Sequence, residues 1–264
     1  MKSLSEELTL YQAICLRGLI ATSLLGLLAW HQGAFRIMPR GRDFWLILVR
    51  TLADVGAAVC FLSALFHLEL GLISAIVQAV PLALTLAGAW FLGHKVGWRR
   101  YGAIVFGFVG VLLIVKPGAA GFNGYSLLAL ASVAFVVLRD LVTRGLSGQT
   151  PSLIVAFLAS AAVTLMGTVI AVPSVWPANL AGLIVTLFFC ALLLVFGLIF
   201  AVTAMRVGEI AVVSPFRYTA IIVAVVLGYF AFGEIPDIWA VIGSLIVVGS
   251  GMYTFYRERI LAGR

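Results

Sequence analysis

The chain has 264 residues, 63% of them hydrophobic and 10% charged, and its formal net charge is +7. Soluble domains carry about 25% charged residues, so this composition excludes a soluble globular protein and predicts an integral membrane protein. The apolar runs are continuous and lack the alternation of barrel strands, so we expect an all-α fold. The basic residues sit at the ends of these runs, which indicates membrane topology and argues against a nucleic-acid partner.

Apolar runs of about 20 residues match a hydrocarbon core about 30 Å thick and predict nine membrane-spanning helices. In chain order they cover residues 12–30, 44–66, 72–92, 98–115, 122–142, 152–172, 180–204, 210–232 and 237–256. Pro81 in the third span and Pro215 in the eighth are expected to kink their helices.

The distribution of arginine and lysine predicts the orientation of these spans. Twelve basic residues fall on one side of the membrane, against Lys2 and Lys116 on the other. Because cytoplasmic loops carry the excess of positive charge, we expect the C-terminus in the cytoplasm and Met1 outside.

Two segments of the chain are similar to each other and indicate an internal repeat. Residues 61–93 align with residues 201–233 without a gap, at an offset of 140 and with five identical positions. The fifth span then has no counterpart, because it maps before Met1. We therefore predict two five-helix halves, residues 1–120 and 121–264, the first of which lacks its first helix through truncation or a misassigned start codon. An odd number of helices per half makes the repeat inverted, an architecture frequent among secondary transporters.

Phrases from both halves carry a resemblance to a known family: LALTLAGAWFLGHKVGWRRYGAIVFGFVGVLLIVKPG, RDLVTRGL, AMRVGEIAVVSPFRYT and VIGSLIVVGSGMYTFYRER. In these phrases the chain resembles the drug/metabolite transporter superfamily, specifically EamA-type permeases. The resemblance implies ten helices in two inverted halves, cytoplasmic termini, and movement of small metabolites without ATP. The chain departs from the family pattern in its missing first helix and in His94, which stands where an acidic residue is usual; Glu234 retains that residue in the second half.

The first candidates for substrate binding are Arg217 and Tyr218, in the phrase SPFRYT. Arginine at membrane depth is costly unless it faces a partner or a watery cavity. Pro215 frees backbone carbonyls nearby, and Arg217 is expected to hold a carboxylate or phosphate, with Tyr218 stacking or hydrogen-bonding. The alternative is that Arg217 extends to the interface or pairs structurally with an acid.

Four further residues are candidates for substrate binding. Arg50 and Asp54 lie one turn apart on the second span, where they form either a substrate site or a buried pair that fixes helix orientation. Arg17 lies within the first span and Gln78 at the middle of the third. For Gln78 the alternative is a hydrogen bond between helices.

Arg139 and Asp140, at the end of the fifth span, form a candidate gate, with a plain interfacial position as the alternative. The three cysteines and three histidines are isolated from one another, so no metal site is predicted. The chain has no GxxxxGK[ST] motif, so we expect no ATP-driven transport and no cofactor. A membrane enzyme is disfavoured, because no nucleophile and base appear at workable spacing.

The sequence therefore predicts a secondary transporter of the inner membrane. We expect it to move a small polar metabolite, anionic or zwitterionic, through a cavity between spans two, three, seven and eight. The energy would come from the proton gradient or from the solute's own gradient. The alternative is a truncated, non-transporting subunit that pairs with another copy, as a homodimer, or with another partner.

Overall fold

The computed structural model describes residues 8–37, 39–91, 97–115, 124–173, 181–207, 217–233, 235 and 237–262. These residues form helices joined by turns, with no strand among them. Seven of the described helices are long and apolar enough to cross a membrane, namely Leu10–His31, Arg42–His67, Leu70–Phe91, Gly124–Arg144, Ser152–Ala171, Leu183–Val207 and Ile238–Arg257. Two shorter apolar helices, Tyr101–Val115 and Thr219–Phe232, fall on the two remaining predicted spans. The predicted class, an all-α polytopic membrane protein, is confirmed.

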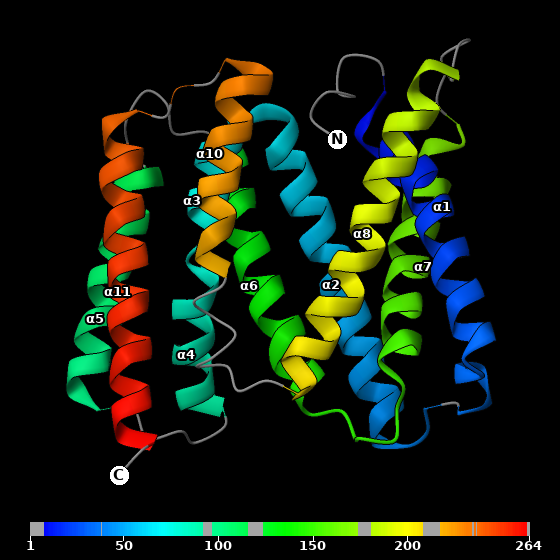
Figure 1. Cartoon of the computed structure of the whole chain (residues 1–264), viewed down its shortest axis with the longest axis horizontal. Coiled ribbons are helices and arrows are strands. Elements are labelled where there is room, and N and C mark those ends of the chain that lie inside the picture. The colour runs from blue at the N-terminus through cyan, green and yellow to red at the C-terminus, as the bar shows by residue number, and fades with distance from the viewer. Residues whose placement is uncertain are drawn as a thin grey trace. The chain divides into compact units, whose positions relative to one another are not determined.

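The helices follow one another as labelled in Figure 1: α1 Leu10–His31, the 3₁₀ turn η2 Ala34–Arg36, α2 Arg42–His67, α3 Leu70–Val77, α4 Val80–Phe91, α5 Trp98–Val115, α6 Gly124–Arg144, α7 Ser152–Ala171, α8 Ala181–Val207, α10 Thr219–Phe232 and α11 Ile238–Ala262. The predicted span 98–115 coincides with α5. The predicted eighth span is described only from Arg217 onward, and Pro215 lies outside the described residues.

The third predicted span is not one continuous helix. It divides at Gln78 and Ala79, where the N–H of Ala79 donates to the carbonyl of Ile76 at 3.0 Å instead of continuing the α-helical pattern. Pro81 lies in the first turn of α4 and has no N–H to donate to the carbonyl of Val77. The interruption therefore sits in the middle of an apolar span.

Local sequence signals fix the ends of several helices. At the start of α1 the Thr9 hydroxyl accepts from the N–H of Gln12 at 3.4 Å, and the Gln12 side chain accepts from the N–H of Thr9 at 2.9 Å. This reciprocal pair is a capping box. At the start of α11, Asp237 accepts from the N–H of Ala240 at 2.7 Å. Gly233 ends α10 in the left-handed conformation, with φ +66°.

The chain divides into two compact units. The first comprises Met1–Ala58 and Val142–Val207, and the second comprises Val59–Leu141 and Gly208–Arg264. Each unit takes helices from both predicted halves, so the predicted halves describe an order along the sequence rather than separate compact bodies. The two halves remain a prediction.

The first unit is built on the contact between α1 and α7. Gly18 of α1 packs directly against Thr164 of α7, where a Cβ would overlap the threonine side chain. The Thr22 hydroxyl is hydrogen-bonded to that of Ser160 at 2.8 Å and to that of Thr164 at 3.0 Å. Small residues and hydroxyls hold membrane helices together in this way. Figure 1 shows α1 and α8 running in one direction and α7 in the other.

The second unit is built on the contact between α5 and α11. Gly110 and Gly243 bring the two backbones together: a Cβ on either glycine would lie 2.8 Å or 2.6 Å from the carbonyl oxygen of the other. The helices are antiparallel, since Gly107 meets Ser250 while Gly110 meets Gly243. In the same unit α3 and α4 descend in Figure 1 whereas α10 ascends, and α3 packs on α10.

The offset of 140 residues relates the helices that pack most extensively. It carries α1 onto α7 in the first unit and α5 onto α11 in the second. Both pairs are antiparallel, as an inverted repeat requires of counterparts that face each other.

Candidate functional site

A buried carboxylate near the end of α6 is the most unusual group in the second unit. Asp140 is 2% exposed. Its Oδ2 accepts from Nη2 of Arg217 at 2.6 Å, and its Oδ1 accepts from Nε of Arg139 at 3.0 Å. Both carboxylate oxygens are thus bound by arginines, one from the same helix and one from a segment 77 residues away.

Gln78, at the interruption between α3 and α4, is hydrogen-bonded to the backbone of Arg217, one of the two arginines that bind Asp140. Its side chain is 3% exposed, and its Nε2 donates to the backbone carbonyl of Arg217 at 3.1 Å. Arg217 and Tyr218 form a 3₁₀ turn that leads into α10. At the offset of 140, Gln78 corresponds to Tyr218, so two corresponding irregular segments touch each other. Interrupted helices at corresponding positions of two repeats commonly mark a transporter's binding site.

Tyr218 is fixed by packing rather than by a hydrogen bond. It is 6% exposed, and among the described residues its hydroxyl has no hydrogen-bond partner. The phenol lies against Gly251 of α11, where a Cβ would overlap the hydroxyl oxygen. The ring therefore sits between the 3₁₀ turn and α11.

Arg50 and Asp54 form a second buried network, in the first unit. Nη1 of Arg50 donates to Oδ2 of Asp54 at 2.6 Å, and the two side chains are 3% and 7% exposed. Nε of Arg50 donates to the hydroxyl of Thr143 at 3.0 Å, and Nη1 also approaches the carbonyl of Val155 at 3.5 Å. This pair joins α2 to the end of α6 and to α7. A substrate site and a buried pair that fixes helix orientation both remain hypotheses for these residues.

Arg17 differs from the other two arginines within the spans. It is half-buried on α1, and its Nε is buried without a hydrogen-bond partner in the part of the chain that the structure describes. Helix α8, which packs against α1 in the same unit, carries Cys190. No carboxylate in the described ranges pairs with Arg17.

The structure therefore brings four of the predicted residues into one cluster: Gln78, Arg139, Asp140 and Arg217. Sequence reasoning did not identify Arg217 and Asp140 as partners, and it missed Thr143. A signal for Thr143 was present, because it follows Asp140 by three residues and both are polar within an apolar helix.

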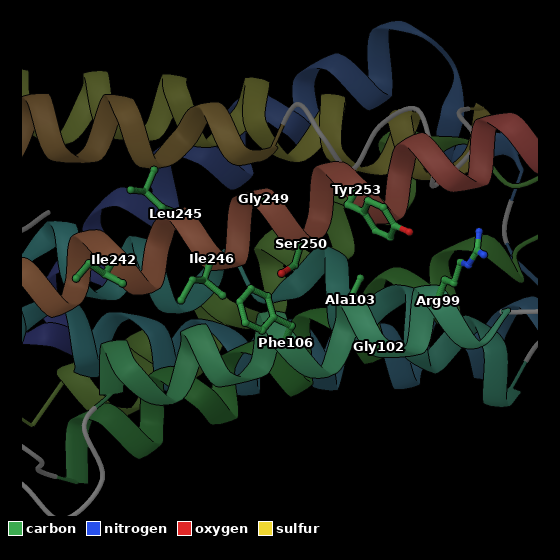
Figure 2. A pocket seen from close by; sticks show the side chains of 10 residues that line it. All are labelled: Arg99, Gly102, Ala103, Phe106, Ile242, Leu245, Ile246, Gly249, Ser250 and Tyr253. Carbon is green, nitrogen blue, oxygen red and sulfur yellow. The ribbon is translucent and has the colours of Figure 1, made fainter.

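An apolar groove of about 650 Å³ runs along α5 and α11 and contains none of the predicted site residues. Figure 2 shows Arg99 at one end of it and Ile242 and Leu245 at the other. Leu245 and Phe106 are 68% and 58% exposed. Such outward apolar side chains suit lipid, so this groove does not suit a polar solute. No group of three metal-ligating side chains occurs in the described ranges.

Comparison with known proteins finds several transporters that are similar to this chain. Over 188 residues the chain is 28% identical to the S-adenosylmethionine uptake transporter of Rickettsia bellii, a match that covers 69% of this chain and 62% of that protein. Over 258 residues it is 27% identical to the pseudopaline exporter CntI of Pseudomonas aeruginosa, covering 94% and 87% of the two chains. Over 205 residues it is 25% identical to the riboflavin transporter of Vibrio cholerae, covering 77% and 68%.

The fold also has a counterpart among solved structures. A protein of known crystal structure matches 98% of this chain with a TM-score of 0.71 and 17% sequence identity, over 91% of its own length. The seven described helices that are long and apolar enough to cross a membrane define a multi-pass membrane protein. Residues 1–116 match the EamA-like transporter family. This match covers less than half of the chain, and it agrees with the resemblance to the drug/metabolite transporter superfamily.

Proposed function

We propose that the chain is a secondary transporter of the inner membrane that moves a small polar metabolite by alternating access. The relatives named above are transporters of S-adenosylmethionine, pseudopaline and riboflavin, which supports a small-molecule cargo. The energy would come from the proton gradient or from the gradient of the solute. The C-terminus would lie in the cytoplasm, because the basic loops fall on its side.

One observation carries the proposal: Asp140 is buried between two arginines where the break between α3 and α4 meets the 3₁₀ turn at the start of α10. Buried charge in a membrane protein is costly and typically marks a solute or proton pathway. The Asp140–Arg217 pair is a contact that can break and re-form, because its arginine side chain is 25% exposed while the carboxylate is 3% exposed. A solute that competes for either partner would change the position of the 3₁₀ turn relative to α6.

The break between α3 and α4, together with the 3₁₀ turn at the start of α10, gives this movement a place to occur. Gln78 fastens the break between α3 and α4 to the backbone of Arg217, so the two segments would move together. In an inverted repeat of residues 1–120 and 121–264, the halves would exchange conformations and expose the site first to one side and then to the other.

Purified full chain in proteoliposomes tests the proposal. The vesicles are loaded with a small-metabolite extract of the expression host, and loss of individual solutes is followed by mass spectrometry against protein-free vesicles. We expect one solute or a small chemical group of solutes to leave selectively. Vesicles that lose no solute faster than protein-free vesicles would instead favour the non-transporting subunit, which pairs with another copy or another partner.

A further inference from the structure

Three arginines lie within the predicted spans, namely Arg17, Arg50 and Arg217. They differ in whether they pair with an acidic side chain. Arg50 pairs with Asp54 at 2.6 Å, and Arg217 pairs with Asp140 at 2.6 Å. Arg17 forms no ion pair and no hydrogen bond with any described residue. Within the described residues, two of the three cations are therefore paired with an acid and Arg17 is not.

Arg17 lies well inside α1, where a charge without an acidic partner is energetically costly. Helix α1 begins at Leu10, so Arg17 lies about 10 Å along the helix axis at 1.5 Å per residue. Its neighbours one turn away, Ile14 and Ala21, are fully buried. The buried Nε holds the base of the guanidinium against the protein instead of leaving it free to extend along the helix to the interface.

We infer that Arg17 binds the anionic group, a carboxylate or a phosphate, of the metabolite that this protein transports, an inference that rests on the proposed function. A guanidinium binds such groups through two parallel hydrogen bonds, which also fix the orientation of the ligand. Arg217 differs from Arg17 because its guanidinium is already paired with Asp140, which a solute would have to displace before an anion could bind there.

The same chemistry occurs in the phosphate of a lipid headgroup, so the two sources need to be separated. A transported solute reaches Arg17 from water, whereas a lipid reaches it from the bilayer. Soluble anions and vesicles of chosen lipid charge therefore distinguish them.

Cys190 provides a native reporter, because it is half-buried on α8, a helix that packs against α1 within the first unit. Replacing Cys15 and Cys60 by alanine leaves it as the sole thiol. The full chain is placed in phosphatidylcholine vesicles and labelled with an anionic and a cationic methanethiosulfonate of similar size. The ratio of the anionic to the cationic rate, compared between variants, cancels the intrinsic difference between the reagents.

The ratio should fall about tenfold in Arg17→Gln, because the reagents have opposite charges close to the guanidinium. It should be retained in Arg17→Lys, which keeps the charge and controls for folding. An unchanged ratio in Arg17→Gln, or no reaction of Cys190 with either reagent, would overturn the inference.

Competition with a soluble probe identifies the source of the anion. Millimolar succinate should slow labelling by the anionic reagent in the protein that retains Arg17 but not in Arg17→Gln, and its uncharged analogue succinamide should have no effect. If added phosphatidylglycerol abolishes the protection by succinate, a lipid holds the site and the inference is wrong. Labelling requires no flux, so a failure of transport in the extract assay remains distinguishable from a failure of this site.

Discussion

Arg217 and Asp140 are 77 residues apart in the sequence, yet Nη2 of the arginine lies 2.6 Å from Oδ2 of the aspartate. The pair connects the entrance of α10 to the end of α6 within the second unit. Removing Asp140 takes the shared carboxylate from both Arg217 and Arg139, whereas removing Asp140 and Arg217 together leaves only Arg139, which is 19% exposed, without that carboxylate.

This asymmetry predicts the stability of the variants. Asp140→Asn should destabilise the protein by about 3 kcal/mol, because Arg217 and Arg139 lose their shared carboxylate. The double variant Asp140→Asn/Arg217→Gln should recover most of that loss. Thermal unfolding in detergent measures both. Glu69→Gln is the matched control, since Glu69 is exposed and its side chain forms no cap hydrogen bond.

The Arg50 network predicts opposite effects of one substitution at two threonines. Thr143→Val should destabilise the protein by about 1–2 kcal/mol, because Nε of Arg50 loses its acceptor. Thr51→Val should be neutral or stabilising, because the buried Thr51 hydroxyl has no partner among the described residues. Unfolding midpoints of the two variants that shift equally would contradict this account of the network.

Two glycines of α11, Gly251 and Gly249, allow the same substitution to be compared at a crowded and at an open position. Gly251→Ala should destabilise the protein by about 1–3 kcal/mol, because the methyl group would overlap the ring of Tyr218, which is 6% exposed and has little room to move. Gly249→Ala should be tolerated, since a Cβ there meets nothing within 4 Å. The fraction of monodisperse protein after heating checks both, and equal losses would show that Tyr218 is not held as described.

Much of the fold could be predicted from the sequence, because helices that span a membrane are long and apolar and a charge within them is energetically costly. The bounds of α5 and the class of the protein followed from these constraints alone. The internal repeat stays a prediction, although its offset of 140 residues relates α1 to α7 and α5 to α11, which pack together.

Partners of the buried charges could not be predicted in the same way. Periodicity places Arg50 and Asp54 on one helical face, since they are four residues apart, but it carries no information about which distant helix faces Arg217. For Arg217 the alternative to anion binding was a structural pair with an acid, and the sequence could not show that Asp140 is the acid within reach. Likewise, the interruption at Gln78 depends on Pro81 together with packing on the segment before α10.

Flux through the double variant Asp140→Asn/Arg217→Gln tests most directly whether this ion pair serves transport or only folding. Vesicles containing equal amounts of folded wild-type protein or folded double variant are loaded with the same metabolite extract. The account predicts that the solutes released by the wild type are retained by the double variant as fully as by protein-free vesicles. Release by the double variant at the wild-type rate would contradict it.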